Sequence, residues 1–140
     1  MSQTSLDGLR VVDLTHGSFN YGGRLLAGLG ADVLKIESPL GDPVRAMPPF
    51  PGDKPDLETS ARHLHLNAGK RSVILDLETQ QSREKLRQLI SGADAVIESF
   101  DVGYLQERGL GYHDLLKVKP DLVMASITHF GQDGPYANYL

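Results

Sequence analysis

The sequence predicts an α/β fold built on a mainly parallel sheet. Five short apolar runs alternate with segments whose apolar residues recur at helical spacing, and this alternation is typical of parallel βαβ units. The stretch Gly22–Glu37 shows one unit clearly, because an apolar helical stripe is followed by two glycines that end the helix and then by a β-rich run. We therefore expect a doubly wound, five-stranded, Rossmann-like sheet.

The first half of the chain begins with an expected strand at Leu9–Leu14 and a loop over Thr15–Gly23. A helix from about Arg24 to Leu29 and a second strand at Asp32–Ile36 follow. Six of the eight prolines then lie within Ser38–Asp56. Because proline fixes φ and lacks an amide donor, residues 38–56 are predicted as a proline-rich loop.

The second half repeats the alternation. Thr79 is an expected N-cap and Gly92 an expected stop for the helix between the third and fourth strands. The other elements are expected as a helix over Glu58–Leu66, strands at Ser72–Leu77, Ala95–Glu98 and Asp121–Thr128, a helical turn near Leu105 and a helix over Tyr112–Val118. The expected core residues are Val11, Val12, Leu25, Leu29, Val33, Ile36, Ile74, Leu86, Val96 and Ile127.

The composition bounds the function. At 140 residues with 40% hydrophobic residues, the chain has the size of one domain, and it contains no cysteine, which excludes disulfides and thiolate chemistry. The net charge of −4 argues against a nucleic-acid partner. No run approaches the roughly 20 apolar residues of a membrane span, so we expect a cytoplasmic protein without a membrane partner.

Ligands of doubly wound sheets bind outside the carboxyl ends of the strands. This rule places Thr15–Gly23, Glu37–Asp42, Glu98–Gly103 and Thr128–Gly134 at the expected functional edge.

Several isolated residue patterns at or near the sheet have ordinary structural explanations. His63 and His65 lack a third ligand at metal-site spacing, and Glu37 has no glycine-rich fingerprint before it that would indicate a dinucleotide site. Lys70 and Arg45 are as consistent with solvated positions as with phosphate contacts.

Seven segments, in order, resemble the N-terminal part of the class III CoA-transferases. They are LDGLRVVDLTH (6–16), LAGLGADVLKIESPLGDPVR (26–45), LNAGKRSVILDL (66–77), ADAVIESF (93–100), GLGYHDL (109–115), PDLVMASIT (120–128) and FGQDGPYA (130–137). The resemblance covers nearly the whole chain and implies that residues 1–140 are the N-terminal, incomplete part of a Rossmann-like CoA-transferase domain.

The resemblance implies a chemistry and a set of partners. A catalytic Asp attacks an acyl-CoA thioester to give a mixed anhydride and then an enzyme-bound CoA thioester, from which an acceptor carboxylic acid takes the CoA. The family's Asp is expected beyond Leu140, so no catalytic residue is expected within this chain and the chain alone is expected to be inactive. The substrates would be acyl-CoA and a carboxylic acid, with no tightly bound cofactor and with a homodimer as the full-length assembly.

The residues implied as CoA contacts are His16, Leu75, Ser99, Phe100 and Arg108. Ser38 and Glu78 stand where some relatives have basic CoA contacts, which predicts a weaker phosphate site. Two alternatives remain open. One is an α-methylacyl-CoA racemase-like enzyme with the same fold, and the other is a diverged, non-catalytic half of a tandem CoA-transferase-like protein.

Overall fold

The computed structural model describes residues 4–137 and 139, in which five strands form one sheet with every neighbouring pair parallel. The strand order is β3-β2-β1-β4-β5. The strands span Arg10–Leu14 (β1), Asp32–Glu37 (β2), Arg71–Ile74 (β3), Ala95–Glu98 (β4) and Val123–Ser126 (β5). The predicted α/β class with a five-stranded parallel sheet is confirmed.

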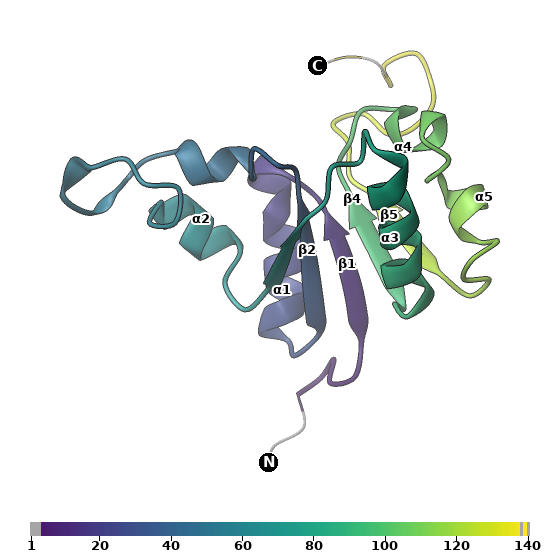
Figure 1. Ribbon diagram of the computed structural model, residues 1–140, viewed down its shortest axis with the longest axis horizontal. Helices are drawn as coiled ribbons and strands as arrows, with labels where there is room; N and C mark the ends of the chain where they lie inside the picture. Colours follow the sequence, from purple (N-terminus) through teal and green to yellow (C-terminus); the bar gives the residue numbers. More distant parts are fainter. Residues whose placement is uncertain (1–3, 138, 140) are drawn as a thin grey trace.

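The helices cover both faces of the sheet (Figure 1). Helix α1 (Asn20–Gly28) lies against one face with α2 (Ala61–Leu66) beside it. On the other face lie α3 (Gln80–Ser91), α4 (Tyr104–Glu107) and α5 (Tyr112–Leu115). This change of face after β3 makes the sheet doubly wound.

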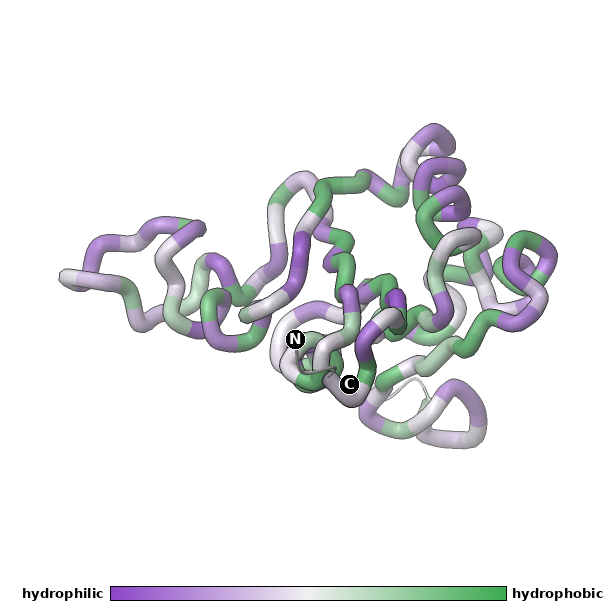
Figure 2. The backbone as a smooth tube through the Cα atoms, turned by 90° about the horizontal axis from the view of Figure 1, so that it is seen from below, coloured by the Kyte–Doolittle hydropathy of each residue, from purple (hydrophilic) through white to green (hydrophobic). Residues whose placement is uncertain are grey.

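The proline-rich segment forms a loop with three-residue and four-residue 3-10 turns, η3 (Pro51–Asp53) and η2 (Pro43–Ala46). The part that carries η3 extends away from the sheet in both orientations (Figures 1 and 2). A third 3-10 turn, η1 (Gly17–Phe19), leads directly into α1. Apart from these short turns, residues 38–56 contain no helix or strand between β2 and α2.

Helix α1 begins at Asn20, four residues before the predicted start, and this corrects the expected loop over Thr15–Gly23. Gly22 and Gly23 concealed the first turn, because glycine is a poor helix former. Gly23 is buried here, and an added Cβ would collide with the Asp13 carboxylate. The glycine therefore reflects close packing of α1 on β1 rather than a loop.

The other boundaries shift by a few residues. Thr79 caps α3 by accepting a hydrogen bond from the Ser82 amide, and Gly92 is the C-cap residue, as predicted. Strand β3 ends at Ile74 instead of Leu77, although Leu75 and Leu77 remain buried.

The core consists of two clusters on opposite faces of the sheet, since alternate residues of a strand point to opposite sides. The larger contains Val12, Ile36 and Val96 from the strands together with helix residues such as Leu86, and the smaller contains Val11, Ala31, Val33 and Ile97. Among the residues expected in the core, Val11, Val12, Val33, Ile36, Leu86 and Val96 are buried and Ile127 is half-buried.

Three of the expected core residues are wrong. Leu25 and Leu29 are 48% and 50% exposed, because they continue an outward stripe of α1 that starts at Tyr21. Leu26 and Ala27 face the smaller cluster instead. Ile74 is 63% exposed because it lies on the edge strand β3. Within residues 4–137 and 139, no helix combines the length and apolar character needed to cross a membrane.

Candidate functional site

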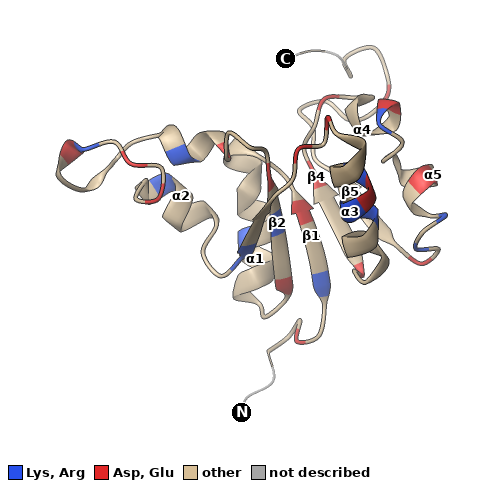
Figure 3. Cartoon of the chain, in the orientation of Figure 1, with Lys and Arg blue, Asp and Glu red and all other residues tan. Residues whose placement is uncertain are grey.

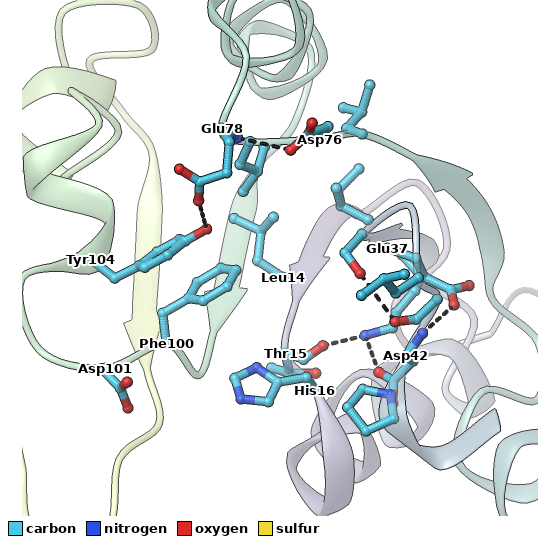
Figure 4. Close-up of a pocket in the computed structure, with 18 residues that line it drawn as sticks. Leu14, Thr15, His16, Glu37, Asp42, Asp76, Glu78, Phe100, Asp101 and Tyr104 are labelled. Carbon is cyan, nitrogen blue, oxygen red and sulfur yellow. Dashed lines mark hydrogen bonds and ion pairs between the residues drawn. The ribbon is translucent and has the colours of Figure 1, made fainter. Parts of the chain in front are cut away.

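A pocket of about 460 Å³ opens at the carboxyl ends of the strands. Its walls come from the ends of β1 and β2, from the segment after β3 and from the residues that follow β4. The strand order reverses between β1 and β4, so the pocket spans this reversal point. Figure 4 shows these side chains around the cavity. This is the position at which doubly wound sheets bind ligands.

The structure brings together all five residues that the resemblance implied as CoA contacts, in two different ways. His16, Leu75 and Phe100 line the pocket directly. Ser99 lies behind His16, whose backbone amide donates to the Ser99 hydroxyl at 3.0 Å, and that hydroxyl lies 3.1 Å from His16 Nδ1. Arg108 lies behind the lining residue Tyr104. Their role in binding CoA stays a prediction.

A row of flat groups forms one wall. The rings of His16 and Phe100 are 5.6 Å apart, and those of Phe100 and Tyr104 stack at 4.3 Å with an interplanar angle of 14°. The guanidinium carbon of Arg108 lies 3.6 Å from the centre of the Tyr104 ring. Offset stacks and cation–π contacts of this kind hold flat groups in fixed orientations.

Glu78 closes the end of this row. It accepts hydrogen bonds from Arg108 Nη2 at 2.8 and 2.9 Å and from the Tyr104 hydroxyl at 2.9 Å. The Arg108 and Tyr104 hydrogen bonds lower the pKa of Glu78, and Glu78 raises the pKa of Arg108. Burial and the Glu78 carboxylate raise the pKa of Tyr104.

A buried polar network supports the pocket floor. Lys35 donates to the Thr15 carbonyl and to Asn20 Oδ1, and its ammonium group pairs with Asp42 at 2.9 Å. Burial raises the pKa of Asp42, but Lys35 and the Asn20 amide outweigh it and lower the pKa. The network fixes the backbone that presents His16, because Thr15 and His16 are consecutive residues.

A second ion pair holds the proline-rich loop to β2. Arg45 donates to both oxygens of Glu37, at 2.7 and 2.9 Å, and Ser72 donates to the same carboxylate. Burial raises the pKa of Glu37, but the hydrogen bonds from Arg45 and Ser72 outweigh it and lower the pKa from 4.5 to about 2. Arg45 therefore has a structural partner, and so does Lys70, which is buried against Asp13 at 2.7 Å.

Carboxylates dominate the charge around the pocket. Figure 3 shows acidic residues at the ends of the central strands and in the segment between β3 and α3. Asp76, Glu78 and Asp101 line the cavity, and Lys35, which also lines it, is already paired. Across the described part of the chain, no three His, Cys, Asp or Glu side chains are arranged to hold a metal ion, and His63 and His65 belong to no such group.

Sequence reasoning missed part of the pocket. The segment after β3 contributes Asp76 beside Glu78, which the resemblance had already pointed to, and α4 contributes Tyr104, whereas Thr128–Gly134 does not line the cavity. Asp76 and Glu78 carried a usable signal, because both lie at the carboxyl end of a predicted strand. Tyr104 carried none, since its place depends on how α4 packs.

A doubly wound sheet with an open pocket at its carboxyl edge is an α/β architecture in which ligands bind at that edge. The sequence profile of CoA-transferase family III matches residues 6–140. The chain belongs to CoA-transferase family III.

Similar proteins agree with this assignment. The chain is 45% identical to the succinyl-CoA:(R)-benzylsuccinate CoA-transferase subunit BbsE of Thauera aromatica, over 93% of this chain and 32% of that protein. It is 42% identical to the succinate–glutarate CoA-transferase of Agrobacterium fabrum, over 96% of this chain and 34% of that protein. The crystal structure of a CAIB/BAIF family protein from Brucella suis superposes with a TM-score of 0.89 at 41% identity, over 99% of this chain and 37% of that one. The chain thus spans about a third of these relatives.

Proposed function

We propose that this chain is the CoA-binding, N-terminal part of a CoA-transferase and that its pocket receives the CoA portion of an acyl-CoA thioester. The observation that carries the proposal is the convergence of His16, Leu75 and Phe100 on one cavity at the carboxyl edge of the sheet. These residues follow three different strands. Their meeting in one cavity is what a shared ligand would require.

The walls suit the apolar and flat parts of such a ligand. Leu14, Leu75 and Leu77 give the cavity an aliphatic side, and the stacked rings of Phe100 and Tyr104 give it an aromatic one. Aromatic faces stack on nucleobases without a sequence or charge requirement. A CoA molecule bound here would place its ring system against this wall.

The complete reaction is proposed to need residues outside this chain. The relatives are about three times as long as the segment that the chain matches, and the resemblance to the family implies a reaction through an aspartyl intermediate. We propose that the nucleophilic Asp lies beyond Leu140, that the acceptor is a carboxylic acid, and that the 140 residues alone do not transfer CoA. Incubation of the purified chain with succinyl-CoA and a dicarboxylic acid is expected to leave the thioester unchanged, and turnover would contradict this.

Binding of CoA tests the proposed site. Isothermal titration of the chain with CoA is expected to show one site, and Phe100→Ala is expected to weaken it by about tenfold, because a base–aromatic stack contributes roughly 1–3 kcal/mol. Tyr112→Ala is the matched control, since Tyr112 is an exposed aromatic residue of α5 outside the cavity. Equal affinities in all three proteins would contradict the assignment of the pocket.

A second candidate function is a supporting, non-catalytic half of a tandem protein. The observation that favours it is the set of carboxylates on the pocket wall, Asp76, Glu78 and Asp101, which repel phosphate groups. A folded chain that shows no heat of binding with millimolar CoA would support this candidate over the first.

The partner in the full-length form is proposed to be a second copy of the same protein. The exposed stripe of α1, formed by Tyr21, Leu25 and Leu29, supports this proposal. Contiguous exposed apolar surface of this kind marks association sites.

A further inference from the structure

The contact between Glu78 and Arg108 occupies the Nε/Nη2 edge of the guanidinium group, one of the two edges that can bind a phosphate in a bidentate manner. Arg108 Nε and Nη2 both donate to Glu78, at 3.1 Å and 2.8 Å to Oε1, with a further contact of 2.9 Å to Oε2. The remaining nitrogen, Nη1, donates to the Tyr104 carbonyl at 3.0 Å. The fork of Arg108 is therefore filled by a carboxylate of its own chain.

The Arg108 and Glu78 side chains differ in how firmly their surroundings fix them. The Arg108 side chain is 19% exposed and is fixed by the Tyr104 carbonyl and by the Tyr104 ring. The Glu78 side chain is 61% exposed and lies on the segment that connects β3 to α3. Loss of the Glu78 carboxylate would thus leave a guanidinium group that Tyr104, a residue lining the cavity (Figure 4), already orients. The carboxylate that would remain near Arg108 is that of Glu107, whose Oε2 lies 3.9 Å from Nη1.

The rest of the cavity wall has few charged groups that would attract an anion. Lys35, the lysine among the described lining residues, is buried and paired with Asp42, whereas Asp76 and Asp101 are carboxylates. Arg108 is consequently a cation that lies beside a lining residue and whose Nε/Nη2 edge a single side-chain change would open. Guanidinium groups match phosphate geometry with two parallel hydrogen bonds.

We propose that Glu78 is a specificity-determining residue, which occupies Arg108 as an internal substitute for a phosphate and so lowers the affinity of the pocket for phosphorylated ligands. The proposal rests on the proposed function, because it concerns the same pocket. In this proposal the Glu78 carboxylate repels phosphate groups. Arg108 is a latent anion site, meaning that its guanidinium group can bind a phosphate once Glu78 no longer occupies it. Ligands that carry a phosphate monoester are therefore discriminated against relative to those that lack it.

The test compares Glu78→Gln with the unchanged chain in titrations with CoA and with adenosine 3′,5′-bisphosphate. Glu78→Gln is expected to tighten both ligands by about tenfold, since a like charge is removed and a charge-assisted bidentate contact becomes available. The gain is expected to shrink as salt increases. Glu84→Gln is the matched control, because it changes the net charge equally at an exposed position of α3, where the carboxylate accepts a hydrogen bond from Gln80. A thermal melt of each variant verifies folding.

The double variant Glu78→Gln/Arg108→Gln separates the two parts of the proposal. It is expected to lose the gain, and a gain that persists without Arg108 would overturn the latent anion site. If the unchanged chain and Glu78→Gln bind CoA equally, the inference fails and the proposed function stands. If only Glu78→Gln binds, the inference stands and CoA binding by the natural sequence fails. If neither binds, both are wrong.

Discussion

Lys35 Nζ and Asp42 Oδ2 lie 2.9 Å apart in an ion pair whose side chains are 2% and 1% exposed. The pair joins β2 to the start of the proline-rich loop, and Asn20 links it to α1 through hydrogen bonds to both partners. A charge this deep requires its partner, since an uncompensated buried charge is strongly destabilising.

Removal of one partner of this pair is expected to destabilise the fold. Lys35→Met leaves Asp42 buried without its counter-ion, at an expected loss of about 3–5 kcal/mol in the free energy of unfolding. Lys117→Met is the matched control at the exposed pair with Asp114, where we expect a loss of at most about 1 kcal/mol. Urea unfolding monitored by circular dichroism measures both. Equal losses would contradict the structural role of Lys35.

The two adjacent glycines of α1 are expected to respond in opposite ways to alanine. In Gly23→Ala the new methyl group meets the Asp13 carboxylate and Lys70 Nζ, and overpacking of this kind costs about 1–3 kcal/mol. In Gly22→Ala the nearest atom is Ile127 Cδ1 at 3.8 Å, so the better helix propensity of alanine stabilises by up to about 1 kcal/mol. Thermal melts of both variants decide the matter, and a stabilised Gly23→Ala would refute the close packing.

Acid is expected to weaken the attachment of the proline-rich loop. The pKa of Glu37 falls from 4.5 to about 2 on folding. A carboxyl with a lowered pKa stabilises the folded state above the unfolded value and loses that contribution as pH falls toward the folded value. Stability should therefore decline between pH 4.5 and about 2, and more steeply in the natural chain than in Glu37→Gln. Parallel pH profiles of urea midpoints for the two proteins would show that Glu37 contributes nothing.

Leu29 and Leu86 are expected to differ in their sensitivity to truncation. Leu29 is half exposed and Leu86 is fully buried. Leu86→Ala should cost about 2–5 kcal/mol, the usual loss for a buried leucine, whereas Leu29→Ala should stay within about 0.5–1 kcal/mol. The spacing of apolar residues alone places Leu29 in the core and so predicts a large loss of stability for Leu29→Ala. The observed exposure of Leu29 predicts a small loss instead. A larger loss for Leu29 than for Leu86 in urea titrations would contradict the observed helix phase.

The outward stripe of α1 is expected to drive association of the isolated chain. Leu25→Glu places a charge in the middle of the stripe, between Tyr21 and Leu29, and should reduce the apparent mass seen by light scattering at high protein concentration. Glu replacement of exposed Leu57, which lies in the segment before α2, is the control. A concentration-independent monomer before any change would argue against this surface as an association site.

Local sequence patterns predicted the sheet well and the burial of individual side chains less well. The strands at Leu9–Leu14 and Ala95–Glu98 were recognisable because short apolar runs between turn residues are typical of parallel strands. Leu25 was misplaced because the helix presents apolar residues on two sides, and only the packing of Gly23 against Asp13 decides which side is inward.

The polar part of the site depends on three-dimensional contacts that no short segment contains. Lys35 lies within a strand and Asp42 in a loop seven residues later, yet their burial results from α1 closing over both. Glu78 and Arg108 are 30 residues apart and meet only because α4 packs beside the start of α3. Resemblance to a known family drew attention to Arg108 and to Glu78 separately, but the contact between them is seen only in the structure.

The most direct test of the central claim is a map of CoA binding on the ¹⁵N-labelled chain by amide chemical shifts. We expect saturable shifts concentrated at His16, Leu75, Ser99 and Phe100, the residues in and behind the pocket wall. Amides of the outward α1 stripe should stay unchanged. Shifts absent at millimolar CoA, or concentrated on α1 and α2 instead of the carboxyl edge of the sheet, would contradict the claim that this pocket binds CoA.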